Sequence, residues 1–238
     1  MNKAEYVKEV FNHIAEHYDL MNTIMTFGMD KKWRSLAVRQ VRARPGAKIL
    51  DVCCGTGQLS FELAKAVGLQ GKIIGLDFSE KMLAIAGQRL NEQNIKQKQD
   101  YGEIITLIQG DAMNLPFKSD TFDGVTIGWG LRNLSDLSES IEEMTRVVKP
   151  GGIIVSLDMA KPHFNIYKQL FWFYIERIVP LMGRILVKNE RAYNYLFQSA
   201  KEFPSQQEIA AIFADCGLKD TRYRNLSGGV VALVSGMK

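Results

Sequence analysis

The sequence predicts an α/β fold, in which a seven-stranded sheet carries helices on both faces and ends in an antiparallel hairpin. Three observations predict it. Short apolar runs alternate with helical patterns through the middle of the chain, as in parallel strands joined by helices. A Gly-x-Gly turn stands where the first apolar run gives way to a helical pattern. Two strand-like runs close the chain with no helix between them.

The expected strands follow one another along the chain at 48–53, 72–77, 105–111, 122–128, 153–158, 218–224 and 230–236. The first five are short and apolar, which is typical of parallel strands buried on both faces. The last two predict the hairpin.

Helices are expected between these strands. One follows the glycine turn, and the next begins after Ser79, which is a typical N-cap residue. The polar residues 91–102 predict a loop. A helix over 137–148 ends at a Lys-Pro-Gly-Gly turn. Ser205, with Glu208 three positions later, matches a capping box ahead of the last helix.

Two segments lie outside the alternation. Residues 1–44 or so predict a helical cap, and about 162–203 predict a helical insertion rich in aromatic residues. We therefore expect one domain over 1–238 that carries both additions. The most apolar stretch is 166–187, but it is interrupted by charges and a proline, so it does not predict a membrane span.

Composition excludes several classes of protein. A net charge of +4 is too mild to indicate nucleic-acid binding. Three cysteines form neither a disulfide framework nor zinc-ligand spacing, so we expect a reducing, cytoplasmic compartment and no metal. His13 and His17 are spaced for a metal on one helix, but a solvated helix face is the simpler interpretation. Cys53 and Cys54 are expected to be small buried residues.

The glycine turn predicts a nucleotide-type cofactor site. Glycines at a strand-to-helix turn let a ligand approach the backbone, and the helix N-terminus offers free N–H groups. Asp77 ends the next strand, 22 positions after Gly55, where a carboxylate can bind both hydroxyls of a ribose. These features fit NAD and S-adenosylmethionine equally well.

Two residues favour S-adenosylmethionine. Ser60 stands where the dinucleotide fingerprint has glycine or alanine, and Asp51 would repel a pyrophosphate but attract a sulfonium and an ammonium. The predicted fold is therefore the Rossmann-like class I S-adenosylmethionine-dependent methyltransferase, and a nicotinamide dehydrogenase is the alternative enzyme class. The candidate cofactor residues are Asp51, Gly55, Thr56, Gly57, Ser60, Asp77, Phe78, Met82, Asp111, Ala112 and Gly128.

Several further motifs are collinear with one methyltransferase family. They are Tyr18-Asp-Leu-Met-Asn22 running to Trp33, Gly130-Leu-Arg-Asn133, Arg146-Val-Val-Lys-Pro-Gly-Gly152, Tyr195-Leu196, Phe203-Pro204 and Gly229-Val-Val-Ala-Leu233. On these residues the chain resembles the ubiquinone/menaquinone biosynthesis C-methyltransferases over nearly its whole length. The resemblance implies methylation of a ring carbon of a prenylated quinol. The paired cysteines and Gly-Leu-Asp-Phe-Ser79 resemble the menaquinone members more closely, which implies demethylmenaquinol as acceptor.

Three positions depart from the family pattern. Asp30 replaces a histidine, Asp158 begins Asp-Met-Ala where the family has Glu-x-Ser, and Val234 replaces a second histidine. They put any catalytic role of those histidines in doubt. They also keep open an alternative acceptor, a ubiquinone-type benzoquinol or another hydrophobic phenol. A non-catalytic binding subunit with this fold is a further alternative.

The resemblance implies that Arg132, Tyr18, Asp19 and Asn133 are catalytic. Arg132 is expected to hold the quinol oxyanion, directly or through a water, because an arginine is too basic to be the base itself. The simpler alternative pairs Arg132 with Asp136 or Glu139 on the next helix.

The quinol acceptor gives the apolar stretch 166–187 an expected role. Its aromatic residues would meet the prenyl tail or the surface of the membrane, transiently and from the cytoplasmic side, and core packing is the alternative. The sequence leaves the oligomeric state open, with a homodimer as the expected assembly.

Overall fold

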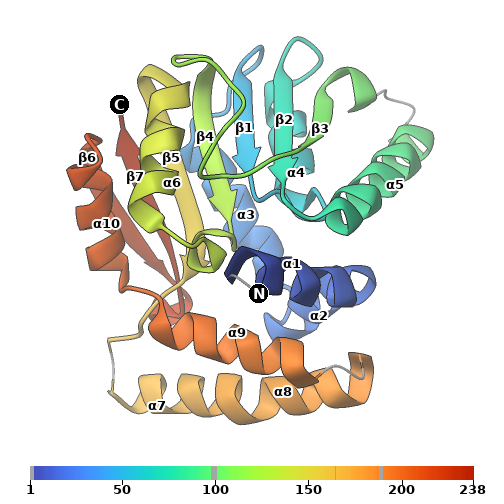
Figure 1. Ribbon diagram of the computed structural model, residues 1–238, viewed down its shortest axis with the longest axis vertical. Coiled ribbons are helices and arrows are strands. Elements are labelled where there is room, and N and C mark those ends of the chain that lie inside the picture. The colour runs from blue at the N-terminus through green and yellow to red at the C-terminus, as the bar shows by residue number, and fades with distance from the viewer. Residues whose placement is uncertain (1–2, 98–100, 164, 188–189) are drawn as a thin grey trace.

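The computed structural model describes residues 3–97, 101–163, 165–187 and 190–238. A single sheet has the strand order β3-β2-β1-β4-β5-β7-β6 (Figure 1). Its strands are β1 Lys48–Val52, β2 Lys72–Asp77, β3 Ile105–Gln109, β4 Phe122–Gly128, β5 Val148–Met159, β6 Lys219–Leu226 and β7 Val231–Met237. Strands β1 to β5 pair in parallel, and β7 pairs antiparallel with both β5 and β6. The predicted fold class is confirmed.

Helices cover both faces of the sheet (Figure 1). Helices α6 and α10 pack on one face over a buried core that includes Phe122, Ile154 and Phe213. Helices α3 and α4 pack on the other, where Ile49 and Leu63 are buried. The helices are α1 Lys3–Ile14, α2 Tyr18–Met25, α3 Met29–Gln40, α4 Gln58–Val67, α5 Glu80–Gln97, α6 Leu137–Val147, α7 Asn165–Phe173, α8 Val179–Met182, α9 Glu190–Glu202 and α10 Gln206–Asp215.

The two predicted helix caps are present. Ser79 Oγ accepts a hydrogen bond from the Met82 amide (3.1 Å), and Ser205 forms a complete capping box with Glu208. The loop predicted over 91–102 is wrong for its first part, because α5 continues to Gln97. Glutamate, glutamine and lysine are good helix formers even without an apolar stripe, and periodicity alone therefore missed the extension.

Helices α1 and α2 lie across the carboxyl ends of the parallel strands, between the sheet and the layer formed by α7, α8 and α9 (Figure 1). A third buried cluster joins this cap to the insertion through Val10, Ile14, Met21, Ile175 and Val179. Between α7 and α9 the helix widens twice into π-helical turns, at Tyr174–Ile178 and Gly183–Val187. Within the described ranges, every helix is too short or too polar to cross a membrane.

Candidate active site

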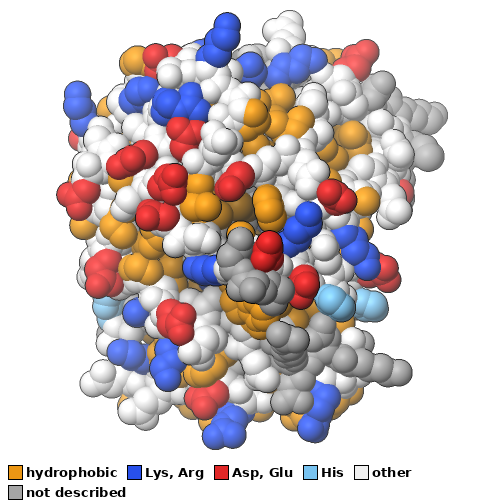
Figure 2. Space-filling model, viewed as in Figure 1, with side chains coloured by type: hydrophobic (Ala, Val, Ile, Leu, Met, Phe, Trp, Pro, Cys, Tyr) orange, Lys and Arg blue, Asp and Glu red, His pale blue; other side chains and the backbone are white. Residues whose placement is uncertain are grey.

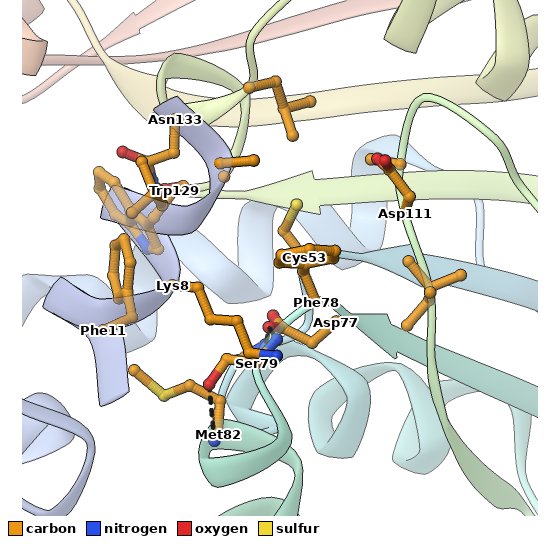
Figure 3. A pocket seen from close by; sticks show the side chains of 18 of the residues that line it. Lys8, Phe11, Cys53, Asp77, Phe78, Ser79, Met82, Asp111, Trp129 and Asn133 are labelled. Atoms are coloured by element: carbon orange, nitrogen blue, oxygen red, sulfur yellow. Dashed lines mark hydrogen bonds between the residues drawn. The ribbon is translucent and has the colours of Figure 1, made fainter. Parts of the chain in front are cut away.

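A cavity of about 110 Å³ opens at the carboxyl ends of β1, β2, β3 and β4. Figure 2 shows apolar side chains gathered around a hollow in the middle of the face of the molecule that is in view. In Figure 3, Asp77, Ser79 and Met82 lie along one part of the cavity wall, Asp111 lies on a second part, and Trp129 and Asn133 lie on a third. We call this space the cofactor cavity.

The glycine turn forms one wall of the cofactor cavity. The backbone passes through the left-handed region at Gly55 (φ 55°) and Gly57 (φ 78°), and Gly57 is the N-cap of α4. A Cβ built on Gly55 meets no atom within 4 Å, so a glycine here leaves the backbone open to a ligand. The side chain that follows, Thr56, is buried and does not line the cofactor cavity.

Asp77 lies at the centre of the site. Its Oδ2 accepts the Gly55 amide and its Oδ1 accepts the Ser79 amide, both at 2.8 Å. Burial raises the pKa of this carboxyl group, although the two amide hydrogen bonds oppose that effect. A carboxylate can accept about four hydrogen bonds. Asp77 is therefore held rigidly and keeps acceptor capacity for the two hydroxyls of a ribose.

Asp51 and Ser60 lie beneath the turn and do not line the cofactor cavity. Asp51 accepts hydrogen bonds from Ser60 Oγ (2.6 Å) and Thr126 Oγ1 (2.8 Å) in the middle of the sheet. Burial raises the pKa of Asp51 to about 6, although both hydroxyls lower it. This buried carboxylate therefore acts on the site through its field and through the turn that it supports.

The other predicted cofactor residues line the cofactor cavity: Phe78, Met82, Asp111, Ala112 and Gly128. Met82 and Ala112 are buried, whereas Phe78 is exposed and has the Lys8 ammonium 5.2 Å from its ring centroid. The Asp111 carboxylate accepts the Met113 amide at 2.9 Å.

The charges around the cofactor cavity fit a cationic ligand. Asp77, Asp111 and Lys8 are the charged side chains that line it within the described residues. Two carboxylates against one ammonium, with Asp51 buried beneath the turn, favour a sulfonium over a pyrophosphate. The residues present thus suit S-adenosylmethionine.

A second cavity, of about 180 Å³, adjoins the first and shares Tyr18 and Trp129 with it. It is lined mainly by apolar and aromatic side chains, among them Met25, Phe27, Met29, Trp33, Met159, Phe171, Tyr174, Ile175, Leu196, Val230 and Val231. Asp30 and Arg132 are the charged residues of its lining, counted over the described chain. We call this space the acceptor cavity.

Arg132 is anchored by Asp158, a partner that the sequence did not predict for it. Its Nη1 donates to Asp158 Oδ1 (2.6 Å) and to the Trp129 carbonyl (2.8 Å), not to Asp136 or Glu139. Burial opposes the charge on Arg132, but Asp158, together with Tyr18 and Tyr195, outweighs burial and raises the pKa of the guanidinium. The alternative pairing with the next helix is therefore wrong, because the turn at 131–133 directs Arg132 back toward β5.

The N-terminal candidates lie in two different settings. Tyr18 lines both cavities, and burial raises the pKa of its phenol while nearby Arg132 lowers it. Asp19 turns the other way: its Oδ1 accepts from Thr56 Oγ1 (2.7 Å), and its Oδ2 forms an ion pair with Arg89. Asn133 lines the cofactor cavity, and its Oδ1 accepts from the Tyr195 hydroxyl (3.0 Å).

Several residues of the site were missed. Trp129 has a positive φ of 61° and lies between the two cavities, but only its place before Gly130-Leu-Arg signals this in the sequence. Phe11 and Lys8 come from α1 and cover the cofactor cavity. Their apolar and basic character is ordinary for an amphipathic helix.

No group of three or more metal-ligating side chains lies together in the part of the chain that the structure describes. His13 is bound through Nδ1 to the Glu9 carbonyl (2.7 Å). Cys53 and Cys54 are free thiols, and burial raises their pKa well above the usual value, so the thiols stay protonated.

The structural neighbours share this fold. A SAM-dependent methyltransferase from Thermotoga maritima superposes with a TM-score of 0.64 at 17% identity and covers 98% of this chain and 99% of its own. One from Aquifex aeolicus gives a TM-score of 0.59 at 22% identity, covering 82% and 83% of the two chains. These likenesses confirm the S-adenosylmethionine-dependent methyltransferase fold.

Sequence relatives are closer. A demethylmenaquinone methyltransferase of Desulfitobacterium hafniense is 59% identical over 237 residues, which is all of this chain and 91% of that protein. One of Bacillus subtilis is 42% identical and covers 100% and 99%. The model of the ubiE/COQ5 methyltransferase family matches residues 1–238. The predicted enzyme class and its cofactor, S-adenosylmethionine, are thereby confirmed, and the chain belongs to the ubiE/COQ5 methyltransferase family.

Proposed function

We propose that this enzyme methylates a ring carbon of a prenylated quinol, converting demethylmenaquinol to menaquinol in menaquinone biosynthesis. One observation carries the proposal: a cavity suited to S-adenosylmethionine shares Tyr18 and Trp129 with an apolar cavity that contains the buried Arg132. The names of the two sequence relatives support the same acceptor.

S-adenosylmethionine, when bound, supplies an activated methyl group. An aromatic ring carbon is a weak nucleophile, so the acceptor hydroxyl beside it must lose its proton and pass electron density into the ring. Once that carbon carries the methyl group, it loses its own hydrogen as a proton, which restores the aromatic ring. Arg132 lines the acceptor cavity and is held in place by Asp158, which lets it stabilise the resulting oxyanion without reorganising. Its pKa is too high for it to accept the proton, so a water or another side chain does so.

Tyr18 and Asn133 position the reactants. Tyr18 lies where the two cavities meet; burial raises the pKa of its phenol, and Arg132 is close enough for its charge to oppose that rise. Asn133 lines the cofactor cavity, and Tyr195 holds its amide oxygen. Asp19 fastens the N-terminal cap to the glycine turn through Thr56. We assign Asp19 a positioning role, because its carboxylate is occupied by Thr56 and Arg89.

Product analysis tests the proposal. The full chain is incubated anaerobically with methyl-labelled S-adenosylmethionine and a panel of reduced, short-prenyl naphthoquinols and benzoquinols. We expect label on the free ring carbon of demethylnaphthoquinol. Label on the benzoquinols alone would assign a ubiquinone-type acceptor, and label on neither class would refute quinol methylation. Arg132→Met is expected to abolish turnover while S-adenosylmethionine affinity stays within about threefold of wild type.

The same proposal includes transient contact with the membrane at its cytoplasmic face. The acceptor cavity is bordered by Phe27, which is 81% exposed, and by Tyr167 of α7. Next to them α7 exposes Ile166, Leu170 and Phe173, which are spaced to share one helix face. Lys168 of α7, and Arg177 and Arg184 further along the insertion, are exposed as well. Exposed apolar side chains among basic ones suit a surface of anionic lipids.

Vesicle sedimentation tests this contact. The protein is expected to bind vesicles containing phosphatidylglycerol more strongly than pure phosphatidylcholine, and Leu170→Asp with Phe173→Asp is expected to reduce binding. Leu69→Asp is the matched control, because Leu69 is similarly exposed in the loop between α4 and β2. Equal binding by the double variant and the control would refute this surface as the site of contact. The homodimer stays a prediction.

A further inference from the structure

Asp30 is a buried carboxylate in the mainly apolar wall of the acceptor cavity. It lies in the first turn of α3, is 3% exposed and lines the acceptor cavity. Its Oδ2 is paired with Arg34 Nη1 at 2.9 Å, which compensates the buried charge. Burying a carboxylate oxygen without a hydrogen-bond partner costs free energy. The partners of the second oxygen, Oδ1, therefore need to be identified.

That second oxygen keeps free acceptor capacity. Asp30 Oδ1 lies 3.2 Å from Thr26 Oγ1, but the same hydroxyl lies 2.7 Å from the Asn22 carbonyl. A threonine hydroxyl has a single proton, and Thr26 donates it to the nearer acceptor, the Asn22 carbonyl. Among the described residues, no other donor to Asp30 Oδ1 is found. Such an oxygen is suited to a ligand that donates a hydrogen bond from within the cavity.

Resting on the proposed function, we infer that Asp30 is an acceptor-binding residue whose Oδ1 receives a hydrogen bond from the quinol hydroxyl that stays protonated. Within the described chain, Arg132 and Asp30 are the two charged residues that line the acceptor cavity, and their charges have opposite signs. A quinol ring carries two hydroxyls on opposite sides of the ring, and the two hydroxyls differ in their effect on the carbon that is methylated. Only the one next to the methylated carbon can direct charge onto that carbon.

The opposite charges of Arg132 and Asp30 determine which of the two hydroxyls ionises. Arg132 favours an oxyanion, so the hydroxyl next to the methylated carbon ionises beside it. Asp30 disfavours a second negative charge, so the opposite hydroxyl keeps its proton and donates to Oδ1. The ring is thereby oriented with the correct carbon toward the methyl donor. The oxidised quinone has no proton to donate, so the same contact selects the reduced acceptor.

A comparison of two acceptors tests this role. One is the short-prenyl demethylnaphthoquinol. The other is its analogue that keeps the hydroxyl next to the methylated carbon and lacks only the hydroxyl on the opposite side of the ring. Wild type is expected to prefer the diol in kcat/KM by on the order of 10- to 100-fold, the range for a hydrogen bond to a charged group. Asp30→Asn is expected to lose most of this preference while its affinity for S-adenosylmethionine is unchanged.

A double variant guards against a folding defect. Asp30→Leu with Arg34→Met removes the whole ion pair, so it leaves no unpaired buried charge. Any change in the intrinsic reactivity of the analogue cancels in the ratio between variant and wild type.

Three outcomes separate the claims. A diol preference that stays intact in Asp30→Asn or, where that variant does not fold, in the double variant overturns the inference. Equal rates on both acceptors in wild type also overturn it, while quinol methylation stands. Absence of methylation of either acceptor by wild type refutes the proposed function itself.

Discussion

Arg132 Nη1 and Asp158 Oδ1 lie 2.6 Å apart in a buried ion pair, with side chains that are 4% and 3% exposed. Asp158 Oδ2 also accepts the backbone amide of Arg132 (3.3 Å), so one carboxylate holds both the turn after β4 and its side chain. The pair joins the end of β4 to β5. The guanidinium that we propose as the oxyanion-binding group is thus anchored to the sheet through Asp158.

The first prediction concerns the stability of this pair. Asp158→Asn leaves a buried guanidinium without its countercharge, and breaking a buried pair on one side costs about 3–5 kcal/mol. We expect chemical denaturation to show a loss of free energy of unfolding of that size. Arg132→Met combined with Asp158→Leu is expected to recover most of it while remaining inactive. A double variant no more stable than Asp158→Asn would argue against the charge as the cause.

The second prediction concerns Asp77. Asp77→Ala removes the acceptor of the Gly55 and Ser79 amides together with the proposed ribose contacts. Charge-assisted hydrogen bonds contribute roughly 1.5–3 kcal/mol each, so calorimetry should show S-adenosylmethionine binding weakened by at least about 10-fold. Asp123→Ala is the control, because its carboxylate pairs with Lys149 away from both cavities. Equal weakening in both variants would contradict a specific role for Asp77.

Much of the fold could be predicted because its information is local. Parallel strands such as β2 are buried on both faces and appear as apolar runs, and the Ser205 capping box marks a helix start within four residues. The end of α5 was missed, because Glu92, Gln93 and Lys96 are polar and compatible with either loop or helix.

Residues of the candidate site could be predicted where their position within a single strand or turn is enough to place them. Asp77 and Asp111 follow from their places at strand ends. The partner of Arg132 lies 26 positions away on β5, and strand register decides it. Trp129 and Phe11 come together because the N-terminal cap docks over the strands, a packing event that spacing does not encode.

The third prediction is a dependence of stability on pH. Burial raises the pKa of Asp51 from 3.8 to about 6, so the folded state binds this proton more tightly than the unfolded chain does. The stabilisation from this proton is full below about pH 4 and is lost as the pH rises through about 6. It amounts to roughly 3 kcal/mol.

Asp51→Asn isolates this contribution from other titrating groups. The difference in free energy of unfolding between the variant and wild type is expected to change by roughly 3 kcal/mol between pH 4 and 7, in favour of the variant at high pH. Denaturant titrations at several pH values measure it. A difference that does not vary with pH would show that Asp51 has an ordinary pKa in the folded protein.

The fourth prediction concerns the clamp between the cap and the glycine turn. Arg89 on α5 donates to the Thr56 carbonyl and pairs with Asp19, so it links α2 to the turn. Arg89→Met is expected to accelerate amide hydrogen exchange over residues 3–25 and to raise the KM for S-adenosylmethionine by about 3- to 10-fold. The change in thermal stability should be small, because the pair is partly exposed. Lys65→Met removes an exposed ion pair to Glu62 on α4 and is the matched control. If both variants left exchange over 3–25 unchanged, the Arg89 clamp would not be what holds the cap in place.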